Sequence, residues 1–301
     1  MTSETYSALA RRLLGGRPLL LGGDVSASLR LLGADVDGPG ALGRLVREQG
    51  DKVDAHYSVE VAAGVDLLST LTSDTTPRAL AQVGMAYRSA AITAMAVDRA
   101  ASAGQQAMRP IAIAGVLGGG SVSPVGVSDL AEDLAEHAAR LEAAGCDLIL
   151  ARGDASRSEL LAAVVAATHA DSPTWAVAAV DSDGTVLGDE SPAEVVRLLE
   201  AAGASALLLD AATVSGARAV IEKIRRSGTT LPLGVLLDAD GPDGVLSPDE
   251  WAEAALQLMS LDLRAFGGGR GCTHEHTAAL SLALRRAVPS MAPPMLSAFR
   301  V

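Results

Sequence analysis

The chain has 301 residues, of which 49% are apolar, 20% charged and 2% aromatic. It can therefore bury a large aliphatic core, and it is too apolar for a disordered protein. The formal net charge of −12 disfavours a nucleic acid or an anionic membrane as partner, because both attract basic surfaces. Two cysteines exclude a disulfide scaffold and any metal site that needs three or four cysteine thiolates of this chain.

The sequence shows neither a signal-peptide pattern at its first residues nor a membrane-spanning segment. Residues Met1–Thr5 lack the basic stretch and apolar core of a signal peptide. No apolar run approaches the roughly 18 residues that a membrane-spanning helix requires. We therefore expect a soluble, cytoplasmic protein with no membrane partner and no nucleic-acid partner.

Eight short aliphatic segments predict β-strands. In chain order they are Pro18–Asp24, Val65–Thr72, Pro110–Leu117, Cys146–Arg152, Thr174–Val180, Ala206–Asp210, Leu231–Asp238 and Leu263–Gly267. Between them lie stretches with apolar residues at helical spacing, such as Leu130, Leu134 and Leu141.

Three predicted helices begin with the same pattern, a serine followed three residues later by a glutamate. They are Ser156–Glu159, Ser191–Glu194 and Ser247–Glu250. In such a capping box the hydroxyl accepts a free backbone N–H, and the glutamate accepts the N–H of the serine. Pro192 and Pro248 stand at the first helical position, where a missing N–H has no cost.

The strand segments are nearly continuous aliphatic runs, such as Leu207–Leu209 and Gly234–Leu237. This pattern indicates burial on both faces, hence a parallel sheet covered by helices. Eight strand–helix units without a linker predict an α/β fold, a single-domain (β/α)8 barrel over residues 1–288, with an irregular C-terminal arm at 289–301. The alternative is an open doubly wound sheet, although Gly22–Ala27 lacks the Gly-x-Gly-x-x-Gly spacing of its usual binding loop.

A barrel binds its ligands at the carboxyl ends of its strands. Cys146 begins its strand and should therefore face the opposite end as a small buried hydrophobic residue. The polar and ionisable residues expected at the mouth are Asp24, Thr70, Thr72, Arg152, Asp154, Asp181, Asp210, Asp238, Asp240, Arg270, Cys272 and His274.

Five segments in order along the chain carry a family resemblance: Leu19–Gly23, His56–Thr72, Ile113–Gly118, Arg140–Leu150 and Gly267–His276. Together they resemble the homocysteine S-methyltransferase family, the homocysteine-binding barrel shared with betaine–homocysteine methyltransferase. The resemblance implies a barrel in which three cysteines bind zinc. The zinc then binds the homocysteine sulfur and lowers its pKa, so that the thiolate attacks a methyl donor.

This chain departs from the family pattern at the reactive positions. Where the resemblance places the three zinc-binding cysteines, the chain has Ala211, Gly269 and Arg270. Arg152 stands where the family has a glutamate, and Asp238 where it has an asparagine. We therefore expect no zinc-thiolate chemistry and no cofactor. The candidate ligand-binding residues are Asp24, Arg152, Asp210, Asp238 and Arg270.

Three interpretations of single groups remain open. Cys272, His274 and His276 could form a different metal site, although the pattern also fits a helix start, where His276 would cap or pack. Asp210 and Asp238 could act as a catalytic acid–base pair, with His274 as a further candidate, or could cap loops. The glycines beside Arg270 could bind an anion or could simply be inherited from a zinc loop.

Two functions follow as hypotheses from different classes. In the first, the barrel binds or converts a small anionic metabolite at its mouth. In the second, the chain is a non-catalytic family member that acts as a subunit or partner-binding protein. Zinc-independent methylation of homocysteine is a third possibility. Homo- or hetero-oligomers fit the sequence equally well.

Overall fold

The computed structural model describes residues 3–15, 17–118, 127–153, 156–181, 184–187, 191–241 and 244–287. The arm predicted at 289–301 and the mouth residue Asp154 lie outside these ranges. No helix within them is long and apolar enough to cross a membrane.

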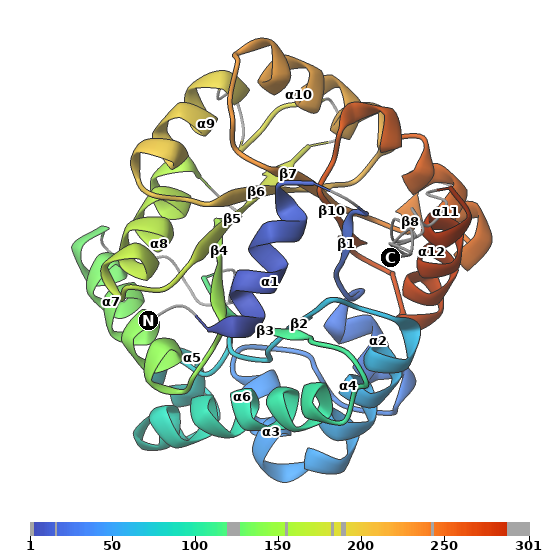
Figure 1. The fold of residues 1–301 in the computed structure, drawn as a ribbon. Helices are drawn as coiled ribbons and strands as arrows, with labels where there is room; N and C mark the ends of the chain where they lie inside the picture. The colour runs from blue at the N-terminus through green and yellow to red at the C-terminus, as the bar shows by residue number, and fades with distance from the viewer. Residues whose placement is uncertain are drawn as a thin grey trace, which may run out of the picture.

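Eight parallel strands of the described chain form a closed barrel (Figure 1), in the order β1-β10-β7-β6-β5-β4-β3-β2. A parallel bridge between Leu21 and Leu67 joins the first strand to the last and closes the ring. The predicted (β/α)8 barrel is therefore confirmed, and the open doubly wound sheet is wrong. Each strand lies inside its predicted segment or extends at most one residue beyond it, and several are shorter than predicted: β1 Leu19–Leu20, β2 Leu67–Ser69, β3 Ala112–Leu117, β4 Leu148–Gly153, β5 Thr174–Val180, β6 Ala206–Ala211, β7 Leu233–Leu237 and β10 Ala265–Gly268.

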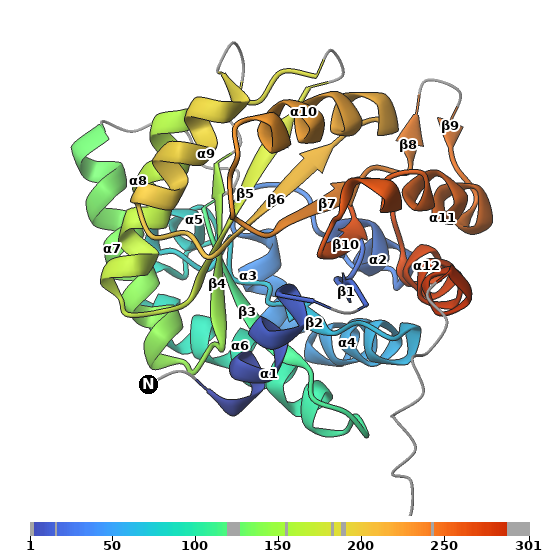
Figure 2. The ribbon, with the colours of Figure 1, turned by 45° about the horizontal axis from the view of Figure 1, so that its top comes forward.

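Helices surround the barrel, and a short antiparallel hairpin of β8 Asp240–Gly241 and β9 Gly244–Val245 follows β7 (Figure 2). The helices of the described chain are α1 Glu4–Leu13, α2 Val25–Leu31, α3 Ala41–Glu48, α4 Gly50–Ala63, α5 Pro77–Ala81, α6 Ser89–Gln105, α7 Val127–Ala143, α8 Arg157–His169, α9 Pro192–Ala201, α10 Val214–Arg226, α11 Pro248–Leu256 and α12 His274–Ala287, with 3₁₀ turns at Ala86–Arg88 and Met259–Leu261.

The three predicted helix starts differ in how they are capped. At α11 the Ser247 hydroxyl accepts the Glu250 N–H, and the Glu250 carboxylate accepts the Ser247 N–H at 3.0 Å, so the capping box is complete. At α8 the Ser156 hydroxyl accepts the Glu159 N–H at 3.2 Å. Ser191 is the N-cap of α9, but its side chain makes no capping hydrogen bond. The hydroxyl cap predicted there is wrong, and the helix begins on Pro192, whose ring fixes φ for the first turn.

The barrel interior is filled by apolar side chains from alternating strand positions. Trp175 of β5 is fully buried among them, together with Leu148, Leu150 and Leu208. Helix α1 crosses the end of the barrel at the amino ends of the strands (Figure 1), and its Leu9 belongs to the same cluster. Only one end of the barrel is therefore left for a ligand.

A cluster of charges holds α1 in place. Asp66 at the start of β2 is 5% exposed and accepts two hydrogen bonds from the Arg12 guanidinium, at 2.7 and 2.9 Å. Arg109 and Arg17 lie 3.8 and 3.9 Å from the same carboxylate. Cys146, at the same end of β4, packs against the apolar core as predicted, and burial raises the pKa of its thiol to about 12.

Candidate functional site

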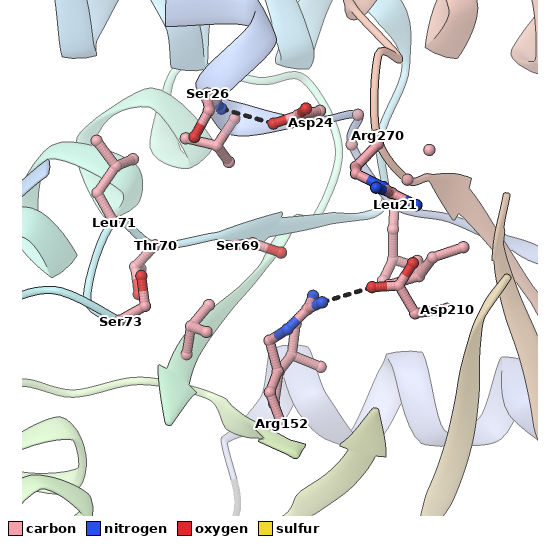
Figure 3. A pocket seen from close by; sticks show the side chains of 18 of the residues that line it. Leu21, Asp24, Ser26, Ser69, Thr70, Leu71, Ser73, Arg152, Asp210 and Arg270 are labelled. Atoms are coloured by element: carbon pink, nitrogen blue, oxygen red, sulfur yellow. Dashed lines mark hydrogen bonds and ion pairs between the residues drawn. The ribbon is translucent and has the colours of Figure 1, made fainter. Parts of the chain in front are cut away.

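A cavity of about 250 Å³ opens at the carboxyl ends of the strands, the end predicted to bind ligands. Figure 3 shows its polar side chains, which come from opposite sides of the barrel. Four of the five predicted ligand-binding residues line it, and Asp238 lies directly behind the wall. The lining residues are Leu21, Gly22, Gly23, Asp24, Val25, Ser26, Leu42, Ser69, Thr70, Leu71, Ser73, Val116, Leu150, Arg152, Asp210, Leu236, Gly268, Gly269 and Arg270.

Arg152 and Asp210 form an ion pair across the cavity. Arg152 follows the buried Leu148 and Leu150 at every second position of β4, so its side chain must face the barrel interior, but at the open end. Asp210 stands in the same relation to Leu208 in β6. An Arg152 Nη2 to Asp210 Oδ2 distance of 2.5 Å joins them (Figure 3). The pair therefore places one cation and one anion side by side at the ligand end.

Arg270 and Asp238 form a second pair beside the first. Asp238 is 5% exposed, and its Oδ1 accepts the Arg270 backbone N–H at 2.7 Å while its Oδ2 accepts Nε at 3.1 Å. Burial raises the pKa of the Asp238 carboxyl, and the negative charge of Asp210 raises it further, whereas both Arg270 groups oppose the change. The Arg270 side chain is 76% exposed, so the remainder of its guanidinium is accessible from the cavity.

Asp24 lines the cavity, but its carboxylate also has a structural role. It is the N-cap of α2, where Oδ1 accepts the N–H groups of Ser26 and Ala27 at 2.8 and 3.2 Å. Its Oδ2 accepts the Gly271 N–H at 3.3 Å, which ties the loop after β1 to the loop after β10. Asp24 therefore fixes the shape of the rim rather than presenting an unused charge.

The sequence interpretation missed the serines of the cavity. Ser69 follows the buried Leu67 by two residues in β2, and this alternation could have revealed it. Ser26 and Ser73 lie on loops and in a first helical turn, where no periodicity indicates which way a side chain points. These hydroxyls add neutral hydrogen-bonding groups beside Thr70, which was predicted at the mouth and lines the cavity.

Cys272, His274 and His276 do not come together as a metal site. His276 is buried with both ring nitrogens used: Nδ1 accepts the Thr273 N–H at 3.1 Å and Nε2 contacts the Leu246 carbonyl at 2.9 Å. Burial raises the pKa of the Cys272 thiol far above its usual value, which opposes the thiolate form. Among the described residues, no group of three or more His, Cys, Asp or Glu side chains is arranged to hold a metal ion. The capping and packing role expected for His276 is the one it has.

His274 also lies outside the cavity lining, at the first position of α12. The carboxylates of Asp210 and Asp238 are near enough for one to influence the pKa of the other, as expected for residues that end neighbouring strands. Each of them, however, is bonded to an arginine. As it stands, the site holds two compensated ion pairs rather than an uncompensated acid–base pair.

Comparison with solved structures finds proteins with a similar fold. Homocysteine methyltransferase MmuM from Escherichia coli, solved in a metallated form, is 20% identical with a TM-score of 0.79 over 91% of this chain and 99% of its own. Its apo form is 19% identical, with a TM-score of 0.72 over 91% of this chain and 99% of its own. The 3-dehydroquinate dehydratase of Geobacillus kaustophilus is 12% identical, with a TM-score of 0.52 over 92% of this chain and 94% of its own. Likeness at these identities reflects the fold alone.

Family membership comes from the sequence itself. A search of curated proteins finds no match. The model of the homocysteine S-methyltransferase family, in contrast, matches residues 19–284, which include all eight barrel strands and the whole cavity lining. The chain therefore belongs to the homocysteine S-methyltransferase family.

Proposed function

We propose that this family member binds a small anionic metabolite at the barrel mouth and does so without zinc-thiolate chemistry. The observation that carries the proposal is what surrounds Asp238. Ala211, Gly269 and Arg270, at the positions where the resemblance places the zinc cysteines, all contact this one carboxylate residue. Ala211 accepts the Asp238 N–H at 3.0 Å, and Arg270 donates two hydrogen bonds to its side chain.

The third position, Gly269, is closed to a larger side chain. A Cβ atom there would overlap Asp238 Oδ1. A cysteine at residue 269 would thus need Asp238 to move, and the Arg270 hydrogen bonds would be lost with it. Catalytic zinc requires three convergent protein ligands, and the residues present here do not fit it.

Two guanidinium groups support an anionic ligand. Arg152 and Arg270 both line the cavity, and a guanidinium can bind a carboxylate or phosphate through two parallel hydrogen bonds. Their aspartate partners hold the two cations in place and moderate their charge. The serine hydroxyls of Ser26, Ser69 and Ser73 can bind uncharged parts of the same ligand.

Calorimetric titration tests the anion site. The probes are succinate, L-methionine, inorganic phosphate and glucose 6-phosphate, added to the wild-type protein, Arg270→Ala and Arg286→Ala. Arg286 is exposed near the end of α12, so its replacement removes an equal charge away from the mouth. We expect one probe class to bind, with affinity reduced about tenfold or more in Arg270→Ala and unchanged in Arg286→Ala. No heat from any probe, or equal heats with all three proteins, would contradict the proposal.

Metal analysis tests the second part of the proposal, the absence of zinc-thiolate chemistry. Protein expressed with added zinc should contain well below one zinc per chain, and it should form no methionine from homocysteine and S-methylmethionine. One firmly bound zinc that contacts the homocysteine sulfur would refute the proposed loss of zinc chemistry. Methionine formation without zinc would instead support zinc-independent methylation.

A further inference from the structure

Glu60 is a buried carboxyl group that the proposed site does not use. It lies on α4 with 2% of its surface exposed, and neither carboxyl oxygen has a hydrogen-bonding partner. A buried carboxylate without hydrogen bonds is unfavourable, whereas a neutral carboxylic acid avoids most of that cost. Burial accordingly raises the pKa of Glu60 to about 7, and the nearby Gly23 N–H and Thr277 hydroxyl lower it by less.

This carboxyl group lies directly against the cavity wall. A Cβ atom on Gly22 would lie 2.8 Å from Glu60 Oε2, so the absence of a side chain at residue 22 is what allows the approach. Gly22 and Gly23 themselves line the cavity. Glu60 is therefore separated from the ligand end by one thickness of backbone.

The ionisable neighbours of Glu60 do not compensate its charge. One turn earlier on α4 is His56, which is buried, has no partner for Nδ1, and has a pKa lowered to about 4 by burial and by His274. The facing helix α12 carries His274, Ser281 one helical turn beyond Thr277, and Arg285 two turns beyond it. Asp24, after β1, is occupied in capping α2. An ionised Glu60 would therefore have no compensating charge beside it and would need new hydrogen-bond donors.

We propose that Glu60 is a proton-binding positioning residue, which holds a proton in the resting fold and, on releasing it, shifts the Gly22–Gly23 wall of the mouth cavity. The ionised carboxylate would draw the Gly23 N–H and the Thr277 hydroxyl into full hydrogen bonds, because both donors are close enough to lower its pKa. The inference concerns the cavity of the proposed function. It needs no ligand to be tested, so either idea can fail without the other.

The first test compares thermal and urea unfolding of wild type, Glu60→Gln and Glu142→Gln across the pH range. Glutamine mimics the neutral acid, and Glu142 is an exposed control on α7. Because the folded pKa is raised, unfolded Glu60 loses its proton near 4.5 while folded Glu60 keeps it to about 7. Relative to Glu60→Gln, the unfolding constant of wild type should rise about tenfold per pH unit between these values and level off above them. Parallel profiles for these two proteins would overturn the proposal.

The second test measures the wall itself. Ser26→Cys places a reactive thiol in the cavity lining, and its labelling rate is followed with and without Glu60→Gln. The native thiols of Cys146 and Cys272 are partly or fully buried, and the parent protein supplies their background. We expect the ratio of the labelling rates with Glu60 and with Glu60→Gln to be constant below about pH 6 and to change through about pH 7. The reason is that only the glutamate can ionise. A constant ratio, with the stability profiles still different, would show that Glu60 titrates without moving the wall and would overturn its positioning role.

Discussion

At the scale of single residues, the carboxylate of Asp238 supports the wall of the mouth cavity from behind. It is buried, it receives a backbone and a side-chain hydrogen bond from Arg270, and it leaves no room for a side chain on Gly269. Buried charges remain in proteins when hydrogen bonds and a counter-ion compensate them. The three positions around Asp238 therefore have to be considered as a unit.

A cysteine introduced at residue 269 tests this interdependence. Gly269→Cys should lower the free energy of unfolding by about 1–3 kcal/mol, because the new Cβ overlaps Asp238. Combined with Asp238→Ala, the same change should cost less than the sum of the two single changes. Gly15→Cys is the control, since nothing lies within 4 Å of a Cβ there. Urea unfolding measures all four, and additive losses would argue against the overlap.

The sequence identified Arg152 and Asp210 because each stands where a predicted strand ends. It could not show that they are bonded to each other, since that distance depends on how the strands between them curve round the barrel. For the same reason the strand ends indicated two arginines and two aspartates at the mouth but not their pairing into two ion pairs. His274 was expected at the mouth from its position along the chain, whereas it stands at the start of α12 outside the cavity lining.

At the scale of elements, helix starts were predictable in position but not in bonding. Ser191 and Ser247 precede a proline and a glutamate in the same spacing, yet only Ser247 forms the capping box. The sequence fixes neither the side-chain rotamer nor the approach of the preceding loop. Helix α2 and the β8–β9 hairpin were not predicted at all, although Asp24 before a polar-and-apolar run was an available N-cap signal.

The two serines form a matched pair for measurement. Ser247→Ala should lower the free energy of unfolding by about 1 kcal/mol, because the Glu250 N–H loses its acceptor. Ser191→Ala should change it by less than about 0.5 kcal/mol, because no capping bond is lost. Chemical denaturation of both variants checks the difference. Equal losses would mean that residue type alone, without the hydrogen bond, determines the effect.

At the scale of the whole molecule, the two ends of the barrel are specialised. One end is sealed by α1 and the charge cluster at Asp66, and the other holds the cavity. The strand pattern and order were predictable, because continuous aliphatic runs allow few arrangements. The seal was not, since it joins Arg12 to a residue 54 positions later and has no periodic signal.

Replacing Asp66 should be more damaging than replacing any one arginine of the cluster. Asp66→Asn leaves the guanidinium groups of Arg12, Arg17 and Arg109 facing one another, and we expect a loss of about 3 kcal/mol in unfolding free energy. Arg12→Ala should cost about 1 kcal/mol, because its side chain is partly exposed and two cations remain. The exposed Asp37 provides a control, Asp37→Asn, with little effect. The reverse order of losses for Asp66 and Arg12 would contradict this account.

The two tryptophans of the chain lie in separate parts of this architecture, and both are inaccessible to water. Trp175 stands inside the barrel, whereas Trp251 donates its indole N–H to the Leu237 carbonyl at 3.0 Å and meets His276 edge-on with ring centroids 5.8 Å apart. Replacing either one with phenylalanine would leave a single tryptophan, which reports from the axis of the barrel if Trp175 is kept and from the helical layer beside the last strands if Trp251 is kept. Intrinsic fluorescence of the two variants can thus show whether the barrel interior and the surrounding helices unfold in one cooperative step, without an added dye.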